Sequence, residues 1–190
     1  EARAHYGLDP DLPTLLVTGG SLGAQRLNTA FADAAEALRA GGVQVVHLCG
    51  RGKQFDPPSG PGPAYVVHEY ADRMELAYAA ADLVVARSGA NTVCELTAVG
   101  LPAVYVPLPI GNGEQRVNAE DVVSAGGGLV IDDTDLTPER IRRDILPLIT
   151  DPDRVAAMAA AAASCGQRDA DERLADLVHA AWQQKGQTKQ

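Results

Sequence analysis

Short apolar runs that end at glycine- or proline-rich loops are the feature that most constrains how this chain can fold. Six such runs, rich in Val and Leu, lie at Thr14–Thr18, Val43–Leu48, Ala64–Val67, Leu83–Ala86, Ala103–Pro107 and Gly128–Ile131. They are continuously apolar rather than alternating, which is typical of parallel strands covered on both faces. Helical patterns separate most of them, at Ala24–Ala40, Arg73–Ala81, Asn91–Val99 and Glu114–Ser124. This alternation predicts an α/β domain with a Rossmann-like, doubly wound parallel sheet.

The pattern changes after the last predicted strand. Thr137-Pro138-Glu139 has the order of an N-cap, a first-position proline and a first-turn acid, and helical segments such as Arg154–Ser164 follow it to about Gln184. A final helix near Asp169–Trp182 would place Leu174, Leu177, Val178 and Ala181 on one stripe. We expect a single domain over residues 1–190, with C-terminal helices and a polar tail that frays from about residue 183.

Charge and cysteine content argue against several classes of function. The chain has 190 residues and a formal net charge of −9, so it lacks the basic footprint that nucleic acid or anionic lipid would require. Its three cysteines are widely spaced and odd in number, which favours buried thiols in a reducing, cytoplasmic compartment over disulfides or a zinc site. No apolar run approaches the roughly 18 residues of a transmembrane segment. Because the first residue is Glu1 rather than Met, we expect a chain that was processed or cut from a longer protein.

The loop Gly19–Gly23, within the stretch VTGGSLGAQRLN, follows the first predicted strand and opens a helix. Its glycines allow close approach to the backbone, and free N–H groups at the positive end of a helix favour an oxyanion. A dinucleotide site would also need an acidic residue about 20 residues later, where this chain has Leu48-Cys49-Gly50-Arg51. The sequence has no G-x-x-x-x-G-K-[ST] motif either. Taken alone, the loop is open to two interpretations, a phosphate site or a tightly packed turn.

A second loop, Arg87–Asn91, also leads from a strand into a helix, and Glu95 follows about one turn later. One interpretation is a capping box, in which Thr92 caps the helix and Glu95 stands three residues on. The other is functional, because the two carboxylate oxygens of Glu95 could accept both hydroxyls of a ribose.

A third loop, Pro107–Gly113, precedes a helix that carries Gln115 and Asn118 on one face. Side-chain amides both donate and accept, which suits sugar hydroxyls, although a solvated first turn would have the same composition. The three loops lie at the carboxyl ends of parallel strands, where open α/β sheets bind ligands. Together they predict a site for a diphosphate that carries sugars on both sides.

Three segments, VTGGSLGAQRLN at Val17–Asn28, ADLVVARSGANTVCELTAV at Ala81–Val99, and Leu101–Asn118, carry a resemblance to a known family. The chain resembles the C-terminal domain of the MurG family, GT-B enzymes that move GlcNAc from UDP-GlcNAc to lipid I to make lipid II in peptidoglycan synthesis. The resemblance implies the donor-binding half of an inverting glycosyltransferase, with the N-terminal acceptor domain and the catalytic residues outside this chain. It also implies a last helix that crosses back to the absent domain, and a full-length protein held peripherally on the cytoplasmic face of the membrane.

The resemblance also assigns roles to individual residues. It places Gly20, Ser21 and Gly23 near the diphosphate; Ala71 at the uracil edge, with Met74 in the same loop; Arg87, Ser88, Gly89, Ala90, Asn91 and Thr92 at the nucleotide; Glu95 on the ribose; and Glu114, Gln115 and Asn118 near the GlcNAc. Two positions depart from the commoner pattern. Asn91 stands where an aliphatic residue is usual, and Glu114 stands where a second glutamine is common.

Several alternatives stay open at this point. A UDP-GlcNAc 2-epimerase, the catalytic subunit of a two-chain lipid-linked GlcNAc transferase, and a non-catalytic UDP-sugar-binding module share the general fold. We expect no cofactor and no essential metal, and interpret Asp132–Asp135 as a solvated turn. The isolated chain is predicted to bind UDP weakly and to transfer nothing.

Overall fold

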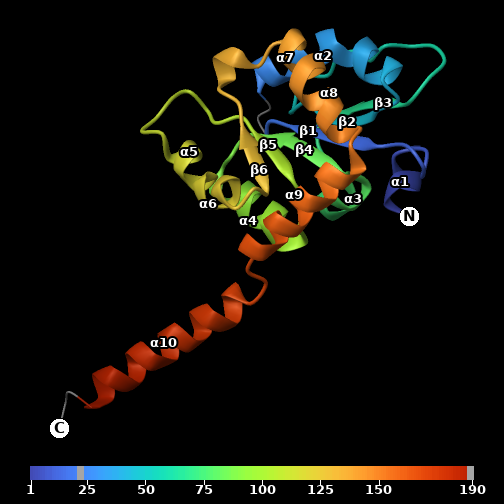
Figure 1. Cartoon of the computed structure of the whole chain (residues 1–190). Coiled ribbons are helices and arrows are strands. Elements are labelled where there is room, and N and C mark those ends of the chain that lie inside the picture. The colour runs from blue at the N-terminus through green and yellow to red at the C-terminus, as the bar shows by residue number, and fades with distance from the viewer. Residues whose placement is uncertain (21–23, 188–190) are drawn as a thin grey trace.

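The computed structural model describes residues 1–20 and 24–187 (Figure 1). Six strands form one sheet in the order β3-β2-β1-β4-β5-β6, and every neighbouring pair is parallel. The strands are β1 (Thr14–Thr18), β2 (Gln44–Leu48), β3 (Tyr65–His68), β4 (Leu83–Ala86), β5 (Ala103–Tyr105) and β6 (Gly128–Val130). The predicted doubly wound parallel sheet is confirmed. Successive strands are added on one side of β1 up to β3 and on its other side from β4 onward. The boundary between β1 and β4 is therefore the topological switch point, where such sheets bind ligands.

The carboxyl ends of the three central strands are level with one another. Thr18, the last residue of β1, pairs with Leu48 at the end of β2 and with Ala86 at the end of β4. The loops that follow these strands therefore start from the same height on the sheet, and side chains from distant parts of the sequence meet there.

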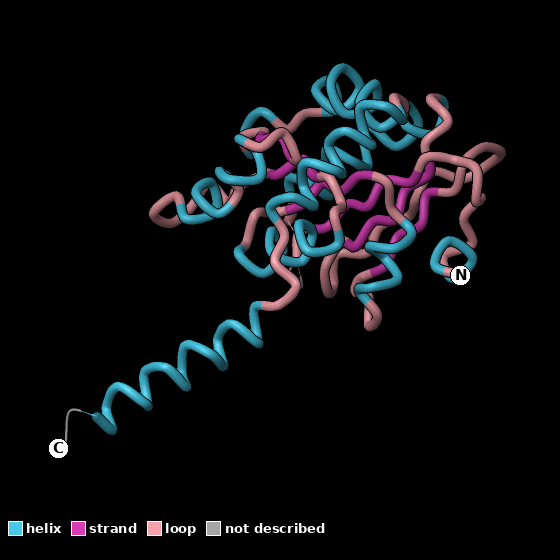
Figure 2. Tube along the Cα trace, turned by 60° about the horizontal axis from the view of Figure 1, so that its bottom comes forward, coloured by secondary structure: helices cyan, strands magenta, loops and turns pink. Residues whose placement is uncertain are grey.

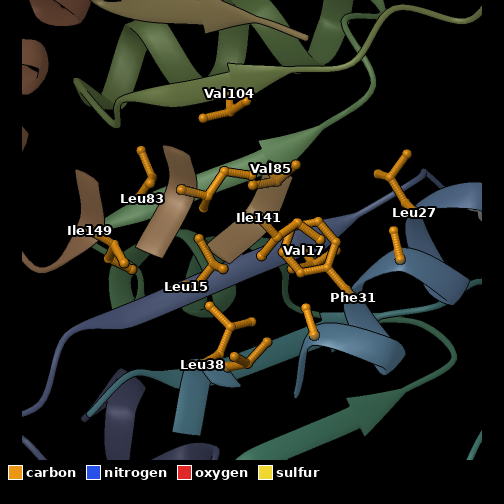
Figure 3. Packing of buried hydrophobic residues seen from close by; sticks show 14 of the residues in the cluster. Leu15, Val17, Leu27, Phe31, Leu38, Leu83, Val85, Val104, Ile141 and Ile149 are labelled. Atoms are coloured by element: carbon orange, nitrogen blue, oxygen red, sulfur yellow. The ribbon is translucent and has the colours of Figure 1, made fainter. Parts of the chain in front are cut away.

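One face of the sheet is covered by α2 (Gln25–Ala40) and by the consecutive segments α7 (Pro138–Arg140), η2 (Ile141–Ile145, one turn of π-helix) and α8 (Leu146–Ile149). In Figure 3, Leu15, Val17 and Val85 of the sheet lie with Phe31 and Ile141 of these helices in one hydrophobic cluster. Successive strand residues point to opposite faces, so Leu16 belongs to the cluster on the other side. This explains why apolar residues occupy both faces of the strands instead of alternating with polar ones.

The opposite face is covered by α1 (Ala2–His5), α3 (Met74–Ala80), α4 (Ala90–Val99) and α6 (Glu120–Ser124). The helix α9 (Pro152–Cys165) contributes Met158 to the first cluster and Ala162 to the second. Thr137 caps α7 as predicted, since its hydroxyl accepts from the Arg140 N–H at 3.1 Å.

The helix predicted over Glu114–Ser124 is divided into α5 (Glu114–Asn118) and α6. The Ala119 N–H donates to the Arg116 carbonyl, three residues back, instead of four. Such a bond tightens the turn and changes the direction of the axis. The short helix α1 was not predicted from the sequence.

The last helix, α10 (Ala170–Gln187), extends away from the body of the domain in both views (Figures 1 and 2). The apolar residues of its stripe are exposed, with Leu174, Leu177 and Val178 at 62%, 68% and 61%. The final helix, predicted near Asp169–Trp182, continues to Gln187, and a tail that frays from about residue 183 stays a prediction. Among the described residues, no helix is both long and apolar enough to cross a membrane.

Candidate functional site

A cleft of about 420 Å³ opens at the carboxyl edge of the sheet. Thr18, Leu48 and Ala86, the level ends of β1, β2 and β4, lie at its base. Its walls come from the loops after β1, β3 and β4 and from α3, α4 and α5. The other lining residues are Gly19, Gly20, Glu69, Tyr70, Ala71, Met74, Tyr78, Arg87, Gly89, Thr92, Glu95 and Gln115. The volume falls in the range of sites for small molecules.

The structure brings many of the sequence-predicted residues together around this cleft. Gly20, Ala71, Met74, Arg87, Gly89, Thr92, Glu95 and Gln115 line it. Five others, Ser88, Ala90, Asn91, Glu114 and Asn118, lie in the same loops and first turns but are not among its lining residues. Ser21 and Gly23 fall outside the described residues. The lining residues Leu48, Glu69, Tyr70 and Tyr78 were not predicted as site residues.

The first loop supplies backbone to the cleft. Gly20 has φ +81°, a conformation that favours glycine, and its N–H donates to the Thr18 hydroxyl at 3.3 Å. Because Gly19 and Gly20 have no side chains, the peptide groups themselves form this wall. The helix α2 begins shortly afterwards at Gln25.

The second loop ends at Gly89, the N-cap residue of α4, which has no side chain to bond the first turn. The capping-box interpretation is therefore wrong, since Thr92 lies within the helix rather than at its cap. Val93 makes the first hydrogen bond of the helix, to the Gly89 carbonyl. The N–H groups of the preceding turn have no partner within the helix and carry its positive end toward the cleft. Glu95 instead accepts a hydrogen bond from the Tyr78 hydroxyl at 2.7 Å.

The third loop is held by two side-chain amides. Gln115 Oε1 accepts from the Leu108 N–H at 3.0 Å, which ties α5 to the loop before it. Asn118 Nδ2 donates to the Ser88 carbonyl at 3.0 Å, which ties α5 to the second loop. Glu114 accepts from Asn112 at 3.0 Å and is exposed. The amides predicted to meet a sugar therefore also connect two walls of the cleft.

Asp133 is buried, so the prediction of a solvated turn over Asp132–Asp135 is wrong at this position. The Asp133 carboxylate lies 2.6 Å from Arg87 Nη2 and 2.9 Å from Arg26 Nε. Arg87 Nη1 also donates to the Val106 and Pro107 carbonyls, at 3.1 Å each. We call Arg26, Arg87 and Asp133 the charged cluster. It joins the loops after β4, β5 and β6 to the first turn of α2. The arginines come from distant parts of the chain, so the acidic run alone did not reveal them.

A second group, Asn28, His47 and Tyr65, forms what we call the neutral cluster. His47 Nδ1 lies 2.8 Å from the Tyr65 hydroxyl, and Nε2 lies 3.0 Å from Asn28 Oδ1. Asn28 Nδ2 donates to the Cys49 carbonyl, so Oδ1 is an acceptor, His47 carries its proton on Nε2, and Tyr65 donates to Nδ1. Burial lowers the pKa of His47 to about 3, and the ring is neutral at pH 7. This cluster was not predicted from the sequence, because a single histidine in a mainly apolar strand predicts no partner.

The rim of the cleft carries a further pair. The Arg51 guanidinium lies over the Tyr70 ring, 5.4 Å from its centroid. Glu69 accepts from the Gly52 N–H at 3.1 Å. These contacts fasten the loop after β2 to the loop after β3. The assembled cleft thus offers backbone N–H groups, the Arg87 guanidinium, two carboxylates and one carboxamide, which suits a ligand with both anionic and hydroxyl groups.

Comparisons with known proteins point in the same direction. The model of the family described as "Glycosyltransferase family 28 C-terminal domain" matches residues 14–174. A UDP-N-acetylglucosamine--N-acetylmuramyl-(pentapeptide) pyrophosphoryl-undecaprenol N-acetylglucosamine transferase of Nocardioides sp. is 61% identical over 181 residues, which are 94% of this chain and 50% of that protein. The protein of the same name from Streptomyces coelicolor is 55% identical over 183 residues, which are 95% of this chain and 50% of the relative.

Solved structures show the same likeness. The crystal structure of Acinetobacter baumannii MurG matches with a TM-score of 0.79 and 27% identity, over 94% of this chain and 52% of that one. The calicheamicin glycosyltransferase CalG4 matches with a TM-score of 0.62 and 30% identity, over 91% and 45%. The chain spans about half the length of the curated relatives it matches.

Proposed function

The chain belongs to the glycosyltransferase family 28 C-terminal domain family, and from this premise we propose that it is the half of an N-acetylglucosaminyltransferase that binds the donor, UDP-GlcNAc. The observation that carries the proposal is the position of Glu95. Its carboxylate lines the same cleft as the Gly19–Gly20 backbone and the first turn of α4. A nucleoside diphosphate presents a diol and an anion, which these groups complement.

In this proposal the reaction inverts the configuration at the sugar. An acceptor hydroxyl attacks the anomeric carbon of GlcNAc, the bond from that carbon to the diphosphate oxygen breaks, and UDP leaves. Negative charge grows on the diphosphate as it departs. The N–H groups at the Gly19–Gly20 turn and at the start of α4 would stabilise that charge. We assign no catalytic residue within this chain, and place the base that takes the acceptor proton in the other half of the protein.

The remaining parts of the proposal concern the whole protein. We propose that lipid I is the acceptor, bound by an N-terminal half, and that the full-length protein acts at the cytoplasmic face of the membrane. The names of the relatives support this acceptor, and their length, about twice that of the matched segment, supports a second half. The exposed apolar stripe of α10 would pack against the N-terminal half.

The rival functions are less well supported. An epimerase or a two-chain transferase would use a similar fold. However, the relatives that match nearly the whole chain are named as transferases, and each is about twice as long as the matched segment, as expected when both halves belong to one chain. The third rival, a non-catalytic UDP-sugar-binding module, agrees with our expectation that the isolated chain binds UDP without transferring a sugar. Product analysis of the full-length protein separates transfer from epimerisation.

The experiment that tests the proposal is a calorimetric titration of the chain with UDP, UDP-GlcNAc and NADH. We expect binding of the two uridine ligands and not of NADH. Glu95→Ala should weaken UDP binding by about tenfold to a hundredfold, which is the loss of affinity expected when hydrogen bonds to a charged group are removed. Glu75→Ala, which removes an exposed carboxylate paired with Arg73 on α3, is the matched control and should leave binding unchanged. Absence of uridine binding, or NADH binding of equal strength, would contradict the proposal.

A further inference from the structure

The Tyr78 hydroxyl on α3 contacts the Glu95 carboxylate on α4 inside the cleft. The oxygen atoms of the two groups lie 2.7 Å apart, and both side chains line the cleft. A carboxylate only accepts, so the phenol is the donor. Burial, reinforced by the bond to Glu95, raises the pKa of Tyr78, and the phenol therefore keeps its proton at neutral pH.

The two residues differ in how firmly they are held. The Tyr78 side chain is partly buried and packs against the hydrophobic cluster on the α3 and α4 side of the sheet. Glu95 is exposed and has three rotatable bonds in its side chain. Without a partner its carboxylate would sample several orientations, and binding would have to fix one of them at a cost in entropy. The hydrogen bond from a packed ring fixes the orientation beforehand.

We propose that Tyr78 is a positioning residue that orients the Glu95 carboxylate toward the two ribose hydroxyls of a nucleotide ligand. The inference rests on the proposed function, because it assumes a uridine nucleotide in this cleft. The Tyr78 hydroxyl occupies one lone pair of Oε2. Oε1 and the second lone pair of Oε2 are then available for a diol. Tyr78 would thereby contribute to the preference for a ribonucleotide without contacting the ribose itself.

The test compares UDP with 2′-deoxy-UDP, which lacks one hydroxyl of the diol. Both are titrated calorimetrically into the unaltered chain and into Tyr78→Phe. The unaltered chain should bind UDP more tightly than 2′-deoxy-UDP. In Tyr78→Phe this ratio should shrink by about threefold to tenfold, the size of one hydrogen bond, while the affinity for 2′-deoxy-UDP changes much less. Tyr65→Phe is the matched control, since it removes a tyrosine hydroxyl bonded at 2.8 Å that does not line the cleft. It should leave the ratio unchanged.

The possible outcomes separate the two proposals. A variant that loses affinity for both ligands by the same factor would show a general structural effect and overturn the positioning role. An unchanged ratio, or equal affinity of the unaltered chain for UDP and 2′-deoxy-UDP, would overturn it as well and leave UDP binding intact. If the unaltered chain bound neither nucleotide, the proposed function itself would fall, and this inference with it.

Discussion

The charged cluster and the neutral cluster hold the same structural element by different physical means. Arg26 and Asn28 both lie in the first turn of α2, and being two residues apart they point in different directions. Arg26 is half exposed and pairs with Asp133, whereas Asn28 is buried and bonds to His47 and Cys49. The charged cluster joins α2 to surface loops through ion pairs, whereas the neutral cluster joins α2 to the sheet through hydrogen bonds between uncharged groups.

The two clusters differ in how disruption of a contact would lower the stability of the fold. The Asp133 carboxylate and the Arg87 guanidinium compensate each other's charge away from water, so loss of either one leaves a poorly hydrated ion without compensation. A neutral network has no net charge to leave behind, and it fails by losing hydrogen bonds or by being forced to accept a proton. The two clusters should therefore respond to different perturbations.

The largest effect is expected from breaking the charged cluster. Asp133→Asn keeps the shape of the side chain but leaves Arg87, whose side chain is 13% exposed, beside an uncharged amide. We expect the free energy of unfolding, measured by urea denaturation, to fall by about 3 kcal/mol. The neighbouring Asp132→Asn removes a pair with Arg116 in which both side chains are 56% exposed, and should cost less than about 1 kcal/mol. Equal losses in the two variants would contradict the distinction between them.

An intermediate effect is expected from acidification, which acts on the neutral cluster. The pKa of His47 is about 3 in the folded chain, below its ordinary value of 6.5, so only the unfolded chain takes up this proton between those values. The contribution to stability is complete above pH 6.5 and is lost as the pH falls toward 3. Between pH 7 and pH 5 the loss should be about 2 kcal/mol.

The matched variant for this pH effect is His47→Gln, which cannot titrate. Its unfolding free energy should be nearly independent of pH over the same interval, although it is lower throughout. The carboxyl groups whose pKa is lowered by their hydrogen-bond partners, Glu75, Glu139 and Asp144, act only at more acidic pH. A slope that persists in His47→Gln would assign the pH dependence to other groups.

The smallest effect is expected from Tyr65→Phe, which leaves His47 Nδ1 without its donor. Thermal or urea unfolding should show a loss of about 1 kcal/mol, as for one buried hydrogen bond. Tyr70→Phe serves as the comparison, because the Tyr70 side chain is half exposed and water can replace its contacts. If both substitutions cost the same, the neutral cluster would not depend on the Tyr65 hydroxyl.

Much of the fold was predictable because local composition and tertiary environment agree. The continuous Val- and Leu-rich runs at Leu83–Ala86 and Gln44–Leu48 match buried parallel strands, and Thr137 caps α7 as its position in the sequence suggests. The loops around Gly20 and Glu95 were identified as site candidates because parallel strands bring their carboxyl ends to one edge. These features depend on neighbours along the chain or on the general geometry of such sheets.

The errors at polar positions have a common origin, because partners that are distant in the sequence change what a local pattern means. Asp133 resembles a solvated turn residue until Arg87 and Arg26 are placed beside it. Thr92 and Glu95 have the spacing of a capping box, but the helix begins earlier, at Ala90, and Tyr78 takes the carboxylate. The polar residues that surround His47 likewise come from α2 and β3.

The sequence by itself determined the class of fold and the alternation of strands with helices along the chain, and it predicted three loops as the place for a ligand. Period, turn chemistry and helix ends are local properties, and each is encoded within a few residues. Only the tertiary structure decided which polar side chains are buried, which atoms pair, and which residue orients Glu95. Those outcomes depend on side chains from separate elements meeting at distances near 3 Å, and no local pattern specifies such meetings.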